Sequence, residues 1–277
     1  MSALDVFVAA VERALPSWPD GIDACAEALG ALATSDDLGA RVAAELAALV
    51  ERPTRTPAAA ASLHCWVLWA GARGAKLCLV RVPAGAGDDA AYLTDAASHQ
   101  LLTPVGTDPV EGDLYEQRDA PDPEVMRAGC VLRARRRVAL RAGDVLSLRP
   151  RRDVFDFLPS DGPRYALVFD GPRAHTQQWV YARETLLPAA SLAADPHDAR
   201  LEAAMRLLRV LGHAPGAPAV ASLARHGAHF VRWTAVRHAA GLDPAQGLAL
   251  LRAAVDDPHP HVRDAARRAL AQLEDPH

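Results

Sequence analysis

The residues best suited to ligand binding lie in the middle of the chain. Asp95 precedes His99 by four residues, so a carboxylate lies near an imidazole that could act as a base or a ligand. Tyr115 and Glu116 are neighbours in an extended run, where successive side chains point to opposite faces. We expect Tyr115 to face the interior, because an unpaired buried carboxylate costs several kcal/mol. The competing interpretation, that His99 is an ordinary hydrogen-bonded or surface histidine, stays open.

An arginine-rich run follows, and its residues alternate between the two faces of a predicted strand. One face carries Arg133, Arg135, Arg137 and Arg141, and the other carries Leu132, Ala134, Val138 and Leu140. The apolar face is expected to point inward, so the four arginines form either a solvated surface or a patch for an anion, an acidic partner or a nucleic-acid backbone. Arg136 has the inward parity. A guanidinium there needs a carboxylate or a bound anion, which makes Arg136 the best single pocket candidate.

Other motifs that carry chemistry are absent from the sequence. The chain has no glycine-rich phosphate loop, no dinucleotide fingerprint and no Gly-x-Ser-x-Gly motif. The four cysteines show no metal spacing, so we expect reduced thiols. His226 and His229 are three residues apart, but Gly227 interrupts that helix and no acidic third ligand lies nearby, while His259 and His261 flank a proline in a turn. We therefore expect no metal site there, and no bound cofactor.

Composition excludes several classes of protein. The net charge of −4 argues against a dedicated nucleic-acid binder. Hydrophobic residues make up 50% of the chain, which excludes global disorder. The first residues carry an early acid and no basic segment typical of a signal peptide, and no apolar run approaches the roughly 20 residues that span a bilayer. These features predict a bacterial-type protein of the cytoplasm with no membrane partner.

The elements that must position these residues fall into three segments. Helical periodicity predicts helices at about residues 5–15, 22–32 and 36–50. Short apolar runs separated by Gly, Pro and Asp predict strands at about 64–69, 76–82, 100–103, 113–117, 131–140, 144–148, 154–157, 165–169 and 178–182. Helical spacing returns at about 196–212, 217–226, 229–241, 244–256 and 260–273. The many short strands are typical of a sandwich or a barrel.

The last segment contains an internal repeat. Residues 230–237 resemble residues 261–268, and this offset of 31 residues is the length of a helical-hairpin repeat. An apolar helix, Asp256-Asp257-Pro258, Val262-Arg263 and Ala265-Ala266 follow one another in an order similar to HEAT repeats. In that family the Asp and Arg residues join adjacent helices by hydrogen bonds. The resemblance implies a surface for binding or packing rather than for catalysis.

The middle segment resembles a cupin, and among cupins the cysteine-dioxygenase-like branch. The resemblance rests on residues 76–87 with their Pro83-x-Gly85 turn, on residues 112–116, and on Gly143-Asp144-Val145 with Pro150. A cupin metal is held by histidines that converge from two strands. The matching positions fall on Ala91 and Leu93, or on Leu93 and Asp95, and on Phe155. The resemblance therefore implies a cupin that has lost its metal.

Together these observations predict an α+β protein. N-terminal helices (residues 1–55) lead into a cupin-type β-barrel (56–192), and a C-terminal module of HEAT-like helical repeats (193–277) follows. We expect a non-catalytic module that binds a protein partner through its repeats and a small polar or anionic ligand in the barrel. The ligand-binding candidates are Arg136, Tyr115, His99, Asp95 and Phe155. The alternative is a cupin-type metal-dependent oxygenase or isomerase with a site rebuilt around His99 and Asp95. Because cupins often pair through their sheets, the resemblance also implies a homodimer.

Overall fold

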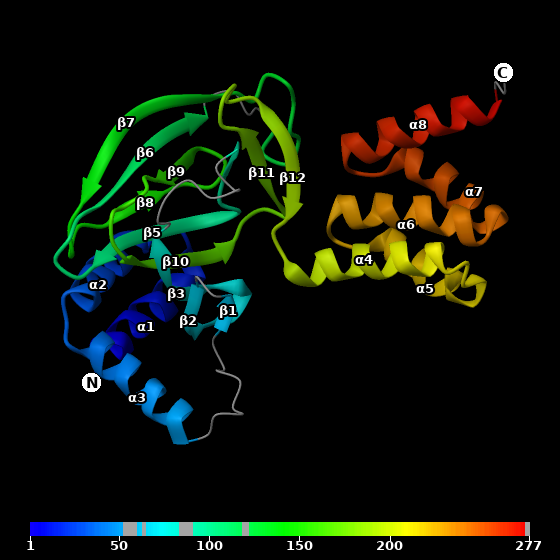
Figure 1. Cartoon of the computed structure of the whole chain (residues 1–277). Coiled ribbons are helices and arrows are strands. Elements are labelled where there is room, and N and C mark those ends of the chain that lie inside the picture. The colour runs from blue at the N-terminus through cyan, green and yellow to red at the C-terminus, as the bar shows by residue number, and fades with distance from the viewer. Residues whose placement is uncertain (52–59, 63–64, 83–90, 118–121, 275–277) are drawn as a thin grey trace. The chain divides into compact units, whose positions relative to one another are not determined.

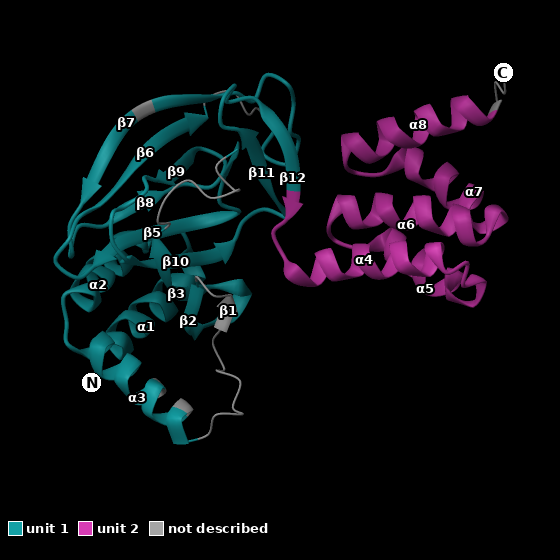
Figure 2. Ribbon diagram, in the orientation of Figure 1, with its two compact units in different colours: residues 1–191 teal, residues 192–277 magenta. Residues whose placement is uncertain are grey.

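The computed structural model describes residues 1–51, 60–62, 65–82, 91–117 and 122–274. By the contacts between its residues, the chain divides into two units. Unit 1 spans Met1–Ser191 and contains the N-terminal helices together with the sheets, and unit 2 spans Leu192–His277 and is helical (Figure 2). No helix in the described ranges is long and apolar enough to cross a membrane.

Unit 1 begins with three helices, α1 (Ala3–Ala14), α2 (Ile22–Ala33) and α3 (Asp37–Glu51). The start of α1 is fixed by a capping box, in which the Ser2 and Asp5 side chains each accept a hydrogen bond from the other residue's backbone N–H. These helices lie where the helical periodicity predicts them.

The strands of unit 1 form three open sheets. They are β1 (Ala60–Ser62), β2 (Cys65–Ala70), β3 (Lys76–Val82), β4 (Tyr92–Thr94), β5 (Ser98–Val105), β6 (Val110–Gln117), β7 (Leu132–Leu140), β8 (Leu146–Leu148), β9 (Asp153–Phe157), β10 (Arg164–Arg173), β11 (Gln177–Ala182) and β12 (Pro188–Ala193) (Figure 1). The strand orders are β1-β2-β3-β10-β5-β8, β12-β11-β4 and β7-β6-β9. The nine predicted strands are therefore present, whereas the expected closed barrel is wrong for the strands that the structure describes.

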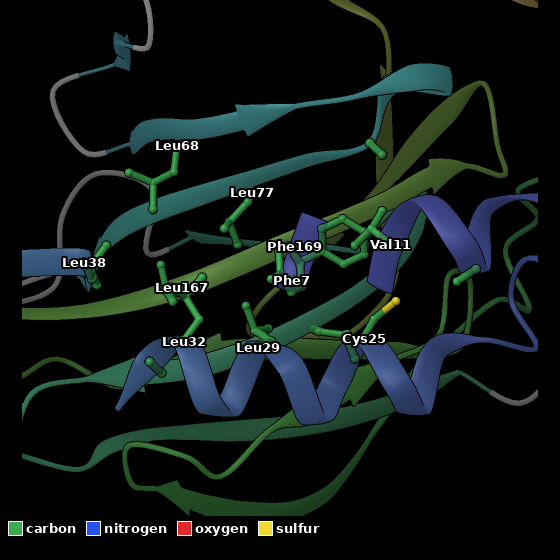
Figure 3. Packing of buried hydrophobic residues seen from close by; sticks show 14 residues of the cluster. Phe7, Val11, Cys25, Leu29, Leu32, Leu38, Leu68, Leu77, Leu167 and Phe169 are labelled. Atoms are coloured by element: carbon green, nitrogen blue, oxygen red, sulfur yellow. The ribbon is translucent and has the colours of Figure 1, made fainter. Parts of the chain in front are cut away.

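Alternation along the strands gives the six-stranded sheet two different faces. Leu77 and Phe169 point to one face, where Phe7 of α1 and Leu29 of α2 cover them (Figure 3). Leu102 points to the opposite face and packs with a second core cluster that includes residues of β6, β7, β8 and β9. The N-terminal helices thus cover the outside of this sheet, and its other face looks into the space shared with β6, β7 and β9.

Unit 2 consists of α4 (Pro196–Val210), α5 (Ala217–Ser222), α6 (His229–Leu242), α7 (Pro244–Ala253) and α8 (Pro260–Glu274). The predicted 31-residue repeat recurs in its hydrogen bonds. Arg232 Nη1 donates to the carbonyls of residues 226 and 227 at 3.0 and 2.9 Å. Arg263 Nη1, 31 residues later, donates to the carbonyls of residues 257 and 258 at 2.8 and 2.7 Å. Arg232 also forms a two-point ion pair with Asp257, so consecutive repeats are joined by charge-assisted bonds.

Candidate functional site

A cavity of about 260 Å³ lies in unit 1, between the inner face of the six-stranded sheet and strand β9. Its lining residues are Cys65, Lys76, Cys78, Val80, Gln100, Leu102, Leu148, Phe155, Phe157, Val168 and Asp170. Small-molecule pockets typically measure about 300–1,000 Å³, so this cavity lies just below that range and suits only a small molecule.

The polar end of the cavity is a row of three side chains on three adjacent strands. Asp170 of β10 pairs in register with Lys76 of β3 on one side and with Gln100 of β5 on the other. The Lys76 ammonium lies 3.3 Å from the Asp170 carboxylate, and Gln100 Nε2 donates to the same carboxylate at 2.6 Å. Burial alone would lower the pKa of Lys76, but the Asp170 carboxylate and the nearby cysteines outweigh it and raise that pKa. The row is therefore a charged pair with no net charge.

Two thiols lie beside this row. Burial raises the pKa of Cys78 to about 12, and its hydrogen bond to Cys65 adds to the effect. Cys78 is therefore a neutral thiol at physiological pH, unsuited to act as a nucleophile or a thiolate ligand. Both cysteines are free rather than joined in a disulfide.

The other walls of the cavity are apolar. Phe155 and Phe157 of β9 pack edge to face, with ring centroids 5.2 Å apart. Gly112 of β6 lets the Phe155 ring approach, because a Cβ at this glycine would lie only 2.2 Å from a ring carbon. On the sheet side, Leu102 and Val168 occupy the row next to the polar one. The cavity thus combines an apolar body with one polar end, the usual design of a small-molecule site.

Of the five predicted ligand-binding residues, only Phe155 lines this cavity. Asp95 instead forms a buried ion pair, in which Arg151 Nη1 donates to its Oδ2 at 2.6 Å. The backbone N–H of Trp179 donates to its Oδ1 at 2.6 Å. The Asp95 and Arg151 side chains are 1% and 5% exposed. Both carboxylate oxygens of Asp95 are therefore already bonded within the protein, which does not suit a partner for His99 or a metal ligand.

Arg151, which is not among the predicted ligand-binding residues, is the centre of this second polar cluster. Its Nε donates to the carbonyl of Pro123 at 2.7 Å, and its Nη2 donates to the carbonyl of Gln177 at 2.6 Å. The guanidinium lies over the Trp179 ring, 4.3 Å from the centroid. Arg151 has a backbone φ of 60°, a left-handed conformation that is uncommon for a residue with a side chain. A guanidinium that is bonded at each of its three nitrogens acts as a cross-link between loops and strands.

Two further predictions concern Tyr115 and Glu116, which are neighbours on β6. Tyr115 is half-buried beside a core cluster of β7, β9 and β11, and burial, with Asp156 and Asp113, raises its pKa. Glu116, expected to face solvent, is 6% exposed and accepts hydrogen bonds from Arg152. The argument against a buried Glu116 assumed that it had no partner, and Arg152 supplies one.

The expectation that Arg136 points inward is wrong, because this side chain is exposed. An irregularity interrupts the pairing of β6 with β7. Ala134 pairs with Tyr115 and Arg136 with Leu114, so one strand advances two residues where the other advances one. Such a bulge breaks the alternation on which the prediction depended.

His99 of β5 lies on the face of the six-stranded sheet opposite to the cavity. Its ring packs edge to face with Trp18, at a centroid distance of 6.3 Å. Burial lowers the pKa of His99, and the charge of Arg149 lowers it further. A neutral, half-buried imidazole packed on an indole fits the competing interpretation of an ordinary histidine.

The positions that match cupin metal ligands do not fit a metal ion. Leu93 and Phe155 have no donor atom, and the Asp95 carboxylate is used by Arg151. Among the described residues, the one group of three or more metal-binding side chains with donor atoms within 4.8 Å of one another lies in unit 2. The alternative of a metal-dependent oxygenase around His99 and Asp95 finds no supporting geometry in the sheets.

No known protein-family model matches the chain, and no curated protein does. Several solved structures are similar to part of it. Hydroquinone 1,2-dioxygenase from Sphingomonas sp. TTNP3 is 14% identical with a TM-score of 0.28, over 41% of this chain and 68% of that one. A sugar phosphate isomerase of the cupin superfamily from Silicibacter pomeroyi is 14% identical with a TM-score of 0.25, over 40% of this chain and 57% of that one. Hydroxypropylphosphonic acid epoxidase from S. wedmorenis is 11% identical with a TM-score of 0.23, over 35% of this chain and 42% of that one.

The matched stretch is thus less than half of the epoxidase chain. At these identities and TM-scores, the similarities carry no argument about fold or activity. The cavity must be interpreted from its own residues.

Its polar row has a sequence signal that is easy to miss. Lys76, Cys78 and Val80 alternate with Leu77 and Leu79, so these three side chains share one face of the strand. That face could have been assigned to the wall of a cavity. The partners on β5 and β10 could not, because their adjacency to β3 depends on the strand order of the sheet.

Proposed function

We propose that unit 1 is a cupin-like module that binds a small, largely apolar molecule through a neutral head group, without a metal and without catalysis. The single observation that carries the proposal is the Lys76–Asp170–Gln100 row at the end of an otherwise apolar cavity. The row is only partly exposed at the cavity wall and so loses part of its hydration, and a ligand that hydrogen-bonds to it recovers part of that cost.

The chemistry of the row selects the head group. An ammonium carries three N–H donors and a carboxylate has four acceptor sites, so both kinds of hydrogen bond are offered beyond the pair's own contact. A ligand amide or hydroxyl donates and accepts without changing the charge of the site. A charged head group would pair with one member of the row and leave the other without its counter-charge, at a cost that the partial exposure of Lys76 (46%) and Asp170 (19%) reduces. We therefore expect neutral amides and alcohols to bind better than the corresponding acids and amines.

A panel of four monosubstituted benzenes tests this selection: benzamide, benzyl alcohol, benzoate and benzylamine. Ligand-observed saturation-transfer NMR on the full chain is expected to rank the two neutral compounds above the two ions. Val80→Phe fills the cavity from β3 and is expected to abolish binding of benzamide. Arg81→Ala changes the next residue of the same strand, which is exposed and points to the other face, and should leave binding intact.

Circular dichroism and the thermal midpoint establish that the Val80→Phe protein is folded. Unchanged benzamide binding by folded Val80→Phe would contradict the proposed location. Equal binding of all four compounds would contradict the role given to the polar row, even if the location is correct.

The helical unit provides the second half of the proposal, a surface for a protein partner. Its similarity to HEAT repeats supports this, as does a groove of about 440 Å³ among α5, α6, α7 and the start of α8. Val236, Leu250 and Val262 give this groove apolar walls, and Arg225 adds a positive charge. Such a groove suits an amphipathic helix with acidic residues. Cross-linking mass spectrometry of a captured complex tests it, and cross-links confined to unit 1 would contradict it.

A further inference from the structure

Three histidines of unit 2 meet where helices α6 and α8 begin. The rings of His229 and His259 are stacked, with centroids 3.6 Å apart and planes within 4°. The ring of His261 lies 5.2 Å from His259 and 6.4 Å from His229. One ring nitrogen from each residue lies within 4.8 Å of the other two. His229 is buried and His261 is exposed, so the group is open to solvent on one side.

The helical repeat explains why residues so far apart in sequence converge. An offset of 31 residues places His229 opposite Pro260, the first residue of α8, and His259 and His261 flank that proline. Figure 1 shows α6 and α8 beginning at the same end of the helical unit. The turn before α8 is held in place, because Asp257 accepts a hydrogen bond from the His259 N–H at 2.8 Å and pairs with Arg232. The ligand set is thus attached to a fixed turn and to the first residue of a helix.

We propose that His229, His259 and His261 bind a first-row divalent transition-metal ion such as Zn²⁺ or Co²⁺. The donor set consists of imidazoles, which suit borderline ions of this kind and do not suit Mg²⁺ or Ca²⁺, whose ligands are oxygens. Three protein ligands leave a fourth tetrahedral position open to water or to a small anion. The earlier expectation of no metal in this part of the chain considered His226 with His229 and His259 with His261 as separate pairs. The three donors instead come from the first residue of α6, the turn before α8 and the first turn of α8.

Binding requires a local change in the rings. Zn–N bonds of about 2.0–2.1 Å in a tetrahedral site place the nitrogens roughly 3.3 Å apart. The three ring nitrogens lie within 4.8 Å of one another, so they must move closer together to bind one ion. A lone pair lies in the plane of its imidazole, so the two stacked rings must also tilt to point at one ion. His261 is exposed and can turn with little resistance. The positive ends of α6 and α8 lie close by, which disfavours a bare cation and favours an anion in the open position. Together these features imply moderate rather than structural-site affinity.

The test uses the full chain without a purification tag. Titration with Co²⁺ is expected to give one equivalent of binding and the visible absorption bands of tetrahedral Co²⁺, which Zn²⁺ then removes by competition. His261→Ala should lower the affinity by at least about tenfold, since even the removal of a residue that only supports a ligand costs that much. His213→Ala removes another exposed histidine of the same unit and should leave the affinity unchanged.

Two results would overturn the proposal. One is Co²⁺ binding of equal affinity in His261→Ala and in the parent protein, which indicates adventitious surface binding. The other is the absence of tetrahedral bands at saturating Co²⁺. Because His261 is exposed, its alanine variant is expected to fold, and the helical signal in circular dichroism verifies this. His229→Gln removes the buried ligand and should likewise weaken Co²⁺ binding, measured on the same absorption bands.

Discussion

The substitution Arg151→Met removes a guanidinium whose three nitrogens donate hydrogen bonds inside unit 1. The Asp95 carboxylate then keeps the Trp179 N–H, but it loses its counter-charge, and the carbonyls of residues 123 and 177 lose a donor. Removing one partner of a buried ion pair costs about 3–5 kcal/mol. Native proteins are stable by about 5–15 kcal/mol, so unit 1 loses a large fraction of its stability. Methionine approximates the apolar part of the arginine side chain and meets the same positive φ, so the loss reports chiefly the guanidinium.

Urea unfolding followed by tryptophan fluorescence measures this loss, because Trp179 lies directly under the guanidinium. Arg137→Met is the matched control. Arg137 also forms an ion pair, with Asp113, but on an exposed face, and its loss should leave the unfolding midpoint unchanged. A loss of less than about 1 kcal/mol for Arg151→Met would equal that of a surface pair. It would refute the assignment of Asp95 to a structural role and return Asp95 to the ligand candidates.

Other outcomes follow from individual contacts. Gly112→Ala should lower the stability of unit 1 by about 1–3 kcal/mol, as overpacking does. Its Cβ would lie 2.2 Å from the Phe155 ring; urea unfolding measures the loss, and Phe155→Leu should restore part of it. His99 should titrate below its ordinary 6.5 in an NMR pH series, because burial lowers its pKa; a value of 6.5 or more would contradict this. Burial raises the pKa of Asp257, but hydrogen bonds from Arg232 and the charge of that arginine hold it below 3.8. The ionised Asp257 therefore stabilises unit 2 above pH 3.8, and this stabilisation is lost as the pH falls through the lower pKa of the folded state. Asp257→Asn should make the free energy of unfolding of unit 2 depend less on pH in this acid range.

Local sequence signals were sufficient for most of the elements. The N-terminal helices and nine of the short strands follow from patterns within a few residues, and the structure places them where those patterns predict. The strands β1, β4 and β12 were missed, because β1 and β4 have three residues each and β12 carries no clear alternation of buried and exposed positions. The number of strands left a sandwich or a barrel open, and closure into a barrel was inferred from the cupin resemblance; neither determines how the strands pair.

The site residues show the limit of arguments from parity and spacing. Arg136 was misplaced by one irregular pairing in β7, which no local pattern announces. Arg151 occupies a turn with positive φ, and its partners come from loops and strands up to 56 residues away. The histidine group of unit 2 is different, because the 31-residue repeat that is visible in the sequence already places His229 beside His259 and His261. Long-range pairing hides a site unless a repeat supplies the alignment.

The two polar clusters of unit 1 differ in what remains for a ligand. In the Asp95–Arg151 cluster the bonds run between protein groups on every side, and the Trp179 ring covers the guanidinium. The Lys76–Asp170 pair is bonded along the sheet but faces a cavity, and the Lys76 side chain is 46% exposed. Removing the first pair should therefore change stability alone. Asp170→Asn, which keeps the size of the side chain but leaves Lys76 without its counter-charge, should instead shift ligand preference from benzamide towards benzoate. A shift in preference with little loss of stability would separate recognition from folding within one unit, whereas an unchanged preference would mean that the row supports the sheet and not a ligand.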